Sequence, residues 1–425
     1  MSKKLNTSPI SGMQEFLPTT QVVFDQIKKK IAKVYQLHGF QHIETPTIDR
    51  NEILFAKAGG DTEKQIYRVI KTTESAEASD QSLRFDHTVP LARYIVEHES
   101  DLSFPFRVTQ IGRNFRGERA QKGRFREFYQ CDVDIIGRGE LPLIYDSQVI
   151  FTFYSALKSF VDTPIKIRLN NRKFISGVLE SIGVGQKAAD IYNIIDHAEK
   201  VPAEKTVAAL KSIDLSEENV VKITTLINTH GSYDQIAKLG YENVGLAELK
   251  QVYQELVDLG LEDEVEIDLK IVRGLDYYTG TVFEAVLPEY PGLGSIGGGG
   301  RYDNLASNYT DQKFPGVGAS IGLSRLFFVL RENDLLKKEL TPAIDYAIIP
   351  LDQSARKTSY QLADYFRADD KVVDVILANK KLGDLMKHAA KIAKFGVVVG
   401  ENEIKSKTFK VKKFATGEQK DLKLK

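Results

Sequence analysis

The chain has 425 residues, of which 42% are hydrophobic and 27% charged, and this length predicts two or three globular domains. Its 58 Lys and Arg balance 58 Asp and Glu, so no overall basic field indicates nucleic-acid binding, and any polyanion site must come from local clusters. The single cysteine, Cys131, excludes a disulfide framework and a cysteine-rich zinc site, and fits a reducing compartment.

The first residues, MSKKLNTSPISGM, have neither the apolar core nor the cleavage pattern of a secretory signal. The sequence contains no run of about eighteen apolar residues, so no membrane span is expected. The histidines are scattered without metal-ligand spacing. We therefore expect a cytoplasmic location, no membrane contact and no metal site built from side chains.

The first predicted element is a helix, because apolar residues recur with helical spacing from Val23 to Tyr35. Thr20 is a candidate N-cap, and Gly39 ends the helix. The segment QHIETPTIDR predicts a strand stopped by Pro46, and KTTESAEASDQ predicts a polar loop.

The next part alternates strands and helices. Residues from about 104 to 137 predict strand, turn and strand, and they are followed by a helix over 146–160 and the short strand IKIRLNN. Residues from about 172 to 262 have helical periodicity and few strand signals, which indicates a helical insertion.

Strand signals then return in EIDLKIVRGLDYYTGTVFEAVL, and GSIGGGGRYD and the helical pattern IGLSRLFFVLREN follow. A linker is predicted over 331–342. Residues 343–425 alternate short apolar strands with helices, which predicts a small α/β domain with a largely parallel sheet. That segment carries 17 Lys and Arg against 11 Asp and Glu, a modest excess that permits contact with RNA.

Residues 112–132, GRNFRGERAQKGRFREFYQCD, hold five arginines and one lysine in a predicted hairpin with Gly123 at its turn. Side chains alternate between the faces of a strand, and one face is polar. This face carries Arg116 and Glu118 from the first strand, and Arg124, Arg126, Phe128, Gln130, Asp132 and Asp134 from the return strand. Arginine binds phosphate or carboxylate with two N–H groups, and Phe128 offers a ring for a base to stack on. The deeper polar groups suit a small, partly cationic molecule, and a solvated edge hairpin is the alternative.

Two further stretches carry candidate ligand groups. In SLRFDHTVPLARY, Asp86 and Thr88 flank His87 before a predicted helix, so they either bind a ligand or cap that helix. In IVRGLDYYTGTVFEAV, Arg273 enters a core-like strand, where a guanidinium needs an anionic partner. A regular strand points Tyr277 and Tyr278 to opposite faces, so at most one should meet a ligand.

The last two stretches are a glycine run and an isolated arginine. Gly297 to Gly300 either let backbone approach a ligand closely or form a flexible loop. Arg325 interrupts an apolar helical stripe, which indicates contact with a phosphate or a salt bridge. ATP together with an amino-acid carboxylate would supply the anions that these separate arginines need.

These stretches together resemble the class II aminoacyl-tRNA synthetases, and within them the histidyl-tRNA synthetase family, from SGMQEFLP to the C-terminus. HIETPTIDR is similar to the first class motif, whose proline helps to form a dimer interface. NFRGERAQKGRFREFYQCDVDIIG and GVGASIGLSRL are similar to the second and third motifs. LRFDHTVPLARY and RGLDYYTGTVFEAV resemble the two stretches specific to the histidine enzymes.

The resemblance implies a role for each matching residue. The histidine-binding set would be Asp86, Thr88, Arg116, Gln130, Asp134, Arg273, Tyr277 and Tyr278. The ATP-binding set would be Arg116, Glu118, Arg124, Phe128 and Arg325. Arg273 and Arg116 would be catalytic, and Mg²⁺ would bind mainly through the ATP phosphates. His87 and Ser324 depart from the family pattern.

The implied fold is α+β, with an antiparallel six-stranded sheet flanked by helices. It would comprise a catalytic domain over 1–330, the insertion at about 172–262, the linker, and an α/β anticodon-binding domain over 343–425. The implied activity is histidine–tRNA ligation by a homodimer that uses ATP, L-histidine and tRNA(His). The alternatives are a catalytically inactive paralogue that acts as a histidine-binding regulatory subunit, and a general tRNA-binding protein of the same fold. Such paralogues typically lack an intact RGLDYYTG-like stretch and the C-terminal domain, and both are present here.

Overall fold

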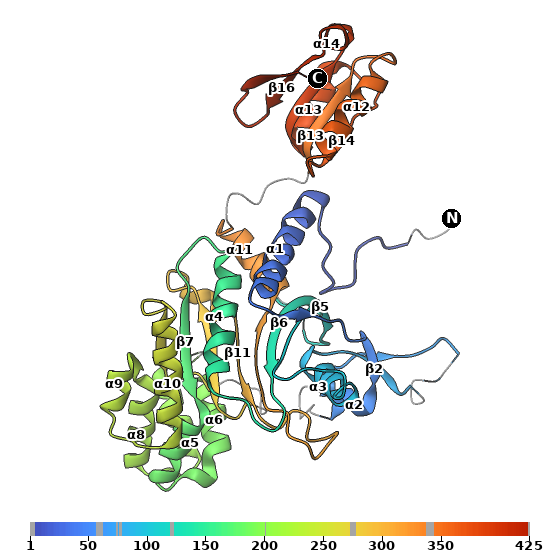
Figure 1. Ribbon diagram of the computed structural model, residues 1–425. Coiled ribbons are helices and arrows are strands. Elements are labelled where there is room, and N and C mark those ends of the chain that lie inside the picture. The colour runs from blue at the N-terminus through green and yellow to red at the C-terminus, as the bar shows by residue number, and fades with distance from the viewer. Residues whose placement is uncertain are drawn as a thin grey trace. The chain divides into compact units, whose positions relative to one another are not determined.

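The computed structural model describes residues 5–56, 63–73, 75, 79–119, 123–199, 201–272, 278–336 and 344–423. The chain divides into two compact units, which are described separately (Figure 1). The larger comprises Met1–Gln14 and Lys28–Lys337, and the smaller comprises Glu15–Ile27 and Lys338–Lys425. Among the described residues, no helix has the length and apolar character needed to cross a bilayer.

The larger unit is built on a sheet of nine strands in the described part of the chain. In spatial order these are β1 (Gln41–His42), β5 (Phe106–Phe115), β6 (Glu127–Ile136), β12 (Gly316–Ile321), β11 (Gly297–Tyr302), β10 (Thr281–Val286), β7 (Lys166–Asn171), β9 (Val265–Asp268) and β8 (His230–Gly231). The six strands from β5 to β7 pair antiparallel, whereas β1 joins β5 and β9 joins β7 in parallel. The predicted six-stranded antiparallel sheet is therefore confirmed.

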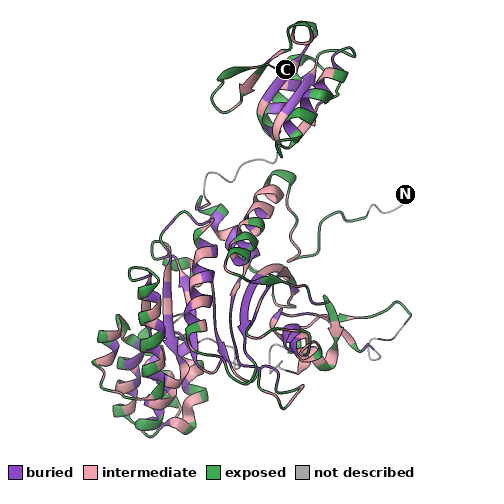
Figure 2. Ribbon diagram, viewed as in Figure 1, coloured by how far each residue is buried: buried purple, intermediate pink, exposed green. Residues whose placement is uncertain are grey.

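One face of this sheet is covered by apolar packing. Cys131, Val133 and Ile135 alternate along β6 and are all 0% exposed, as the parity of the strand predicts. Helix α4 (Ile144–Lys158) packs against β12, and α11 (Leu323–Glu332) packs against β6. The buried strands appear purple in Figure 2. The opposite, polar face of β6 is thereby left to form a site.

The predicted insertion is helical in the structure (green to yellow in Figure 1). Its helices are α5 (Arg172–Ser181), α6 (Ala188–His197), α7 (Ala203–Ser212), α8 (Glu217–Asn228), α9 (Tyr233–Ala237) and α10 (Val244–Asp258), with the 3₁₀ turn η3 (Gly185–Lys187). The Asn171 and Asn243 side chains cap α5 and α10. A Cβ on Gly245 would lie 2.0 Å from the backbone nitrogen of Phe174, so only glycine lets these two helices approach so closely.

Three local predictions need correction. Helix α1 (Pro18–Leu37) begins before Thr20, because proline suits the first helical position, so Thr20 is not the N-cap. QHIETPTIDR forms two short strands instead of one, and the second, β2 (Ile48–Arg50), belongs to another sheet. The glycine run is strand β11, so the flexible-loop interpretation is wrong.

The remaining elements of the larger unit surround this second sheet. Its strand order is β2, β4 (Gln81–Leu83) and β3 (Arg68–Val69). The helices and turns are α2 (Asn51–Phe55), η1 (Glu63–Gln65), α3 (Thr88–Glu97) and η4 (Pro291–Leu293). Helix α3 follows β4 after only four residues, which places its start beside the hairpin of β5 and β6.

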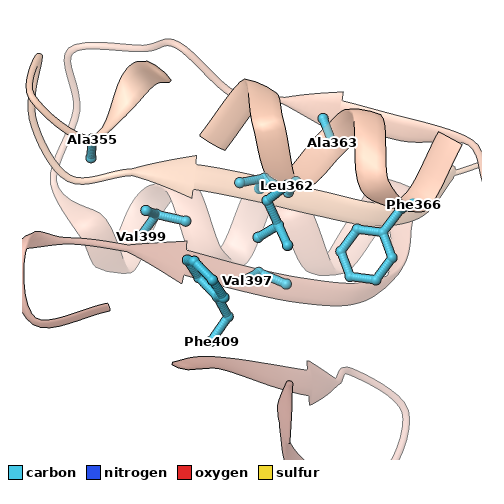
Figure 3. Close-up of a cluster of buried hydrophobic side chains, with 8 residues drawn as sticks. Ala355, Leu362, Ala363, Phe366, Val397, Val399 and Phe409 are labelled. Carbon is cyan, nitrogen blue, oxygen red and sulfur yellow. The ribbon is translucent and has the colours of Figure 1, made fainter. Parts of the chain in front are cut away.

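The smaller unit contains a five-stranded sheet with helices on both faces. Its strand order is β14 (Val373–Val375), β13 (Ile344–Pro350), β15 (Ala393–Val399), β16 (Thr408–Lys413) and β17 (Gln419–Lys423). Its helices are α12 (Arg356–Arg367), α13 (Leu382–Ile392) and α14 (Glu401–Ser406). The predicted small α/β domain is confirmed, but its sheet is only partly parallel: β13 pairs parallel with β14 and β15, whereas β16 pairs antiparallel with β15 and β17. Leu362 and Phe366 of α12 pack on Val397 and Phe409 (Figure 3), and α13 covers the other face.

Candidate active site

The larger unit holds a cavity of about 650 Å³ over the polar face of β6. Every predicted site residue that falls within the described part of the chain lines it. These residues are Asp86, Thr88, Arg116, Glu118, Arg124, Phe128, Gln130, Asp134, Tyr278 and Arg325. Arg273 and Tyr277 lie outside the described residues. The structure therefore gathers segments more than 200 residues apart in sequence around one space.

The cavity floor comes from three adjacent strands. Asp134 of β6 pairs with Gly318 of β12, and Asp132 pairs with Ser320, which pairs in turn with Gly298 of β11. Directly opposed residues of antiparallel strands project to the same side. A Cβ on Gly318 would lie 1.8 Å from Asp134 Oδ1, so the glycine leaves this carboxylate its space. Gly298 and Gly318 line the cavity, so no side chain fills its floor at these two positions.

The deep end of the cavity is acidic. The Tyr302 hydroxyl donates to Asp134 Oδ1 at 2.8 Å, and the Ser320 hydroxyl donates to Asp132 Oδ1 at 2.6 Å. Burial raises the pKa of Asp134 to about 7, although the Tyr302 hydrogen bond opposes the shift. Burial also raises the pKa of Asp132 well above its ordinary value. Burial shields both carboxyl groups from water, so a cationic ligand would stabilise their ionised forms.

Asp86 lies at the start of α3 and also faces the cavity. Its Oδ1 accepts the Val89 backbone N–H at 3.1 Å, and Thr88 is the first residue of the helix. Burial raises the pKa of the Asp86 carboxyl, against the effects of the Val89 hydrogen bond and the charge of Arg116. Helix capping and ligand binding were alternatives for Asp86, and the geometry allows both at once because a carboxylate has two oxygens.

The other end of the cavity is cationic. Arg124 lies 3.6 Å from Glu118, and Arg325 Nη2 donates to the Leu293 carbonyl at 3.3 Å. Burial and the charge of Arg124 lower the pKa of Arg325, so the two guanidinium groups are close enough to repel. The half-buried carboxylate of Glu118 cannot neutralise the charges of both Arg124 and Arg325, so this end of the cavity can also bind a polyanion.

Arg116 is held by aromatic rings. Its guanidinium carbon lies 4.1 Å from the centre of the Phe85 ring and 5.1 Å from that of Phe128, and its Nε donates to the Phe85 carbonyl at 3.4 Å. Cation–π contacts of this kind favour one orientation of the guanidinium. Arg116 lines the cavity and is close enough to Asp86 for its charge to lower the pKa of that carboxyl, so it borders the acidic end.

Several lining residues were not predicted as site residues: Gln65, Phe85, Asp132, Tyr302 and Ser320. Strand parity already placed Asp132 on the correct face. No local signal could have identified Tyr302 or Ser320, because they reach the cavity through strand pairing. Arg126 shares the polar face but bonds the carbonyls of Glu118 and Ser11 instead of lining the cavity.

His87 and Ser324, which depart from the family pattern, are both buried. His87 is 1% exposed, and its ring lies against the backbone of Gly112 and Gln130. Burial and the Arg84 guanidinium lower the pKa of His87 to about 3, so the ring is neutral. Ser324 Oγ accepts the Tyr129 backbone N–H at 2.9 Å, which fixes the start of α11 to β6.

Comparison with known proteins places this geometry in context. A family model described as "Histidyl-tRNA synthetase" matches residues 12–326, and one described as "Anticodon binding domain" matches residues 345–425. The histidine–tRNA ligase of Clostridium tetani is 41% identical over 427 residues, which cover 98% of this chain and 96% of the relative. That of Clostridium acetobutylicum is 39% identical over 433 residues and covers 99% of both chains.

Solved structures agree in fold. The crystal structure of histidyl-tRNA synthetase from Nostoc sp. PCC 7120 has a TM-score of 0.89 and 33% identity, covering 99% of this chain and 97% of that one. An ATP phosphoribosyltransferase regulatory subunit/histidyl-tRNA synthetase from Bacillus halodurans has a TM-score of 0.74 over 91% of this chain and 97% of that one. Its 23% identity shows a shared fold only.

Proposed function

Because the chain belongs to the histidyl-tRNA synthetase family, we propose that it activates histidine with ATP and transfers the histidyl group to the 3′ end of tRNA(His). The observation that carries this proposal is the polarity of the cavity, with arginines at one end and buried carboxylates at the other. A triphosphate suits the first end. An amino acid with an ammonium and an imidazole suits the second.

The reaction has two steps. A histidine carboxylate oxygen attacks the α-phosphorus of ATP, the bond to the bridging oxygen breaks, and histidyl-adenylate and pyrophosphate form. The 3′-terminal ribose hydroxyl of tRNA then attacks the acyl carbon, and AMP leaves. No protein nucleophile is needed, so positioning and stabilisation of charge by fixed arginines supply most of the acceleration.

The acidic end would bind histidine. Asp86, Thr88 and Gln130 are proposed to hold the α-ammonium. Asp134 and Tyr278 are proposed to contact the imidazole, with Tyr277 adjacent. Selection follows because a different side chain would leave these buried polar groups without partners, which strongly disfavours its binding.

The cationic end would bind ATP. Phe128 is proposed to stack on adenine, and Arg124 and Arg325 to hold the γ-phosphate. Arg116 would contact the α-phosphate and the histidine carboxylate. Glu118, the carboxylate beside Arg124, would lie near the adenine or a Mg²⁺-bound phosphate. The family resemblance implies that Mg²⁺ binds mainly through the ATP phosphates, whose charge it would neutralise.

Arg273 is proposed as a second catalytic cation, at the reacting phosphate. Its replacement by alanine should slow adenylate formation far more than it weakens ATP binding, because the contact would strengthen in the transition state. A contact of this kind is worth on the order of 10²–10³ in rate. Equal effects of Arg273→Ala on rate and on ATP affinity would contradict the assignment.

The remaining proposals concern organisation. We assign the catalytic domain to residues 1–330, with its insertion at about 172–262 and a linker over 331–342. Residues 343–425 would contact tRNA, in keeping with the anticodon-binding family that they match. A homodimer and a cytoplasmic location are proposed from the family resemblance, and a free, buried Cys131 fits a reducing compartment. The regulatory-subunit alternative is not favoured, because ligases match nearly the whole chain.

Histidine-dependent exchange of pyrophosphate into ATP tests the activity without tRNA. The purified chain with Mg²⁺ should catalyse the exchange, and its absence while both ligands bind would contradict the proposal. Arg325→Ala should reduce the rate by about 10²-fold. Arg113→Ala is the matched control, because Arg113 lies on the same hairpin but pairs with Glu127 at 2.8 Å outside the cavity.

A further inference from the structure

A continuous chain of hydrogen bonds runs along one side of the cavity floor. Asn114 Nδ2 donates to Gln130 Oε1 at 2.7 Å, and Gln130 Nε2 donates to Ser320 Oγ at 2.6 Å. Ser320 Oγ in turn donates to Asp132 Oδ1 at 2.6 Å. Gln130, Ser320 and Asp132 line the cavity, whereas Asn114 is 0% exposed.

The chemistry of the chain fixes its direction. A bound cationic ligand would keep Asp132 ionised in spite of its burial, and an ionised carboxylate only accepts, so Ser320 gives it the single hydroxyl proton. The Ser320 oxygen then accepts from Gln130, which must present its Nε2–H. Gln130 Oε1 is thereby turned toward Asn114, which donates. A flipped Gln130 amide would place its Oε1 against the Ser320 oxygen, whose only proton is already donated to Asp132.

We propose that Asn114 and Ser320 are positioning residues that hold the Gln130 amide with its carbonyl oxygen available to the α-ammonium of histidine. This inference rests on the proposed function. Asn114 uses one lone pair of Gln130 Oε1, and the second remains for an ammonium N–H. A flipped amide would present N–H dipoles to a cation. Fixing the amide before the substrate arrives removes an ordering cost from binding.

Ser320→Ala tests the chain on its accessible side. The variant should raise the histidine KM in pyrophosphate exchange by about tenfold, because Gln130 Nε2 loses the acceptor that fixes the orientation of its amide. The ATP KM and kcat should stay within about twofold, since the chain does not reach the cationic end. Ser320→Thr keeps the hydroxyl, and the added methyl group has space because position 320 pairs with Gly298, which has no side chain. This variant should therefore have the histidine KM of the unaltered chain. Equal loss in the alanine and threonine variants would overturn the proposal.

Asn114→Asp tests the direction itself. At a pH where the new carboxyl is ionised, an aspartate at this position only accepts, so Gln130 would have to turn Nε2 toward it and present Oε1 to Ser320. Ser320 would then give its proton to Gln130, and Asp132 would lose its donor. The histidine KM should rise by more than about tenfold, the ATP KM should not change, and an unchanged histidine KM would contradict the proposal.

A double-mutant cycle separates positioning from general damage. In a Gln130→Ala background, adding Ser320→Ala should change histidine affinity by less than about twofold, since its effect passes through Gln130. Independent, multiplying effects would refute the proposal. If the chain binds histidine but catalyses no exchange, histidine affinities measured by calorimetry replace the KM values in this test. In that case the proposed function fails, while a selective loss in Ser320→Ala still supports positioning and an unchanged affinity refutes it.

Discussion

Replacing Tyr302 with phenylalanine should shift the pH at which the cavity binds histidine. The Tyr302 hydroxyl donates to Asp134 Oδ1 at 2.8 Å, and it stabilises the ionised carboxylate. Burial raises the pKa of Asp134 to about 7, so this carboxyl is close to half ionised at neutral pH. Loss of the hydroxyl removes a group that opposes the effect of burial, and the pKa should rise further.

The size of the shift follows from the hydrogen bond. A bond to a charged group contributes about 1.5–3 kcal/mol, which corresponds to roughly one to two pKa units. A rise of about one unit lowers the ionised fraction of Asp134 at pH 7 from roughly one half to roughly one tenth. If the ionised form binds the imidazole, the histidine KM should increase about fivefold at pH 7 and recover by about pH 9.

The assay is the histidine KM in pyrophosphate exchange from pH 6 to pH 9, for the unaltered chain and the variant. Free histidine titrates identically in both, so the difference between the profiles reports the protein group. Tyr309→Phe is the control, because the Tyr309 hydroxyl bonds the Ile53 carbonyl at 3.3 Å outside the cavity. An unshifted profile, or a shift to lower pH, would refute the role assigned to Asp134.

Further predictions concern stability and shape. Arg301→Ala should lower the free energy of unfolding by about 3–5 kcal/mol in urea titrations, because it strips Asp146, 0% exposed, of a guanidinium 2.7 Å away. Gly318→Ala should abolish histidine binding in calorimetry while ATP still binds, because the new Cβ would lie 1.8 Å from Asp134 Oδ1. The pKa of Asp134 is about 7 in the folded state, against an ordinary value of 3.8, so between these pH values the folded state keeps a proton that unfolding releases. The free energy of unfolding should therefore fall as the pH rises from about 4 to about 7. Asp134→Asn should remove that part of the pH dependence, which unfolding at pH 5 and pH 8 would measure.

Much of the site was predictable because strands alternate. Parity along β6 alone separated Cys131 and Val133, in the core, from Gln130 and Asp134, in the cavity. The same rule did not distinguish Arg126 from its neighbours. Its side chain bends to nearby carbonyls, and a two-residue period carries no information about such local partners.

The sequence alone determined the order of elements, the polar face of the hairpin and the family, since periodicity and motif chemistry are local properties of the chain. Only the tertiary structure decided that Tyr302 supports Asp134 and that Ser320 orients Gln130. These pairs are separated by 168 and 190 residues. Their meeting depends on which strands become neighbours and in what register, and that is set by burial of the whole sheet.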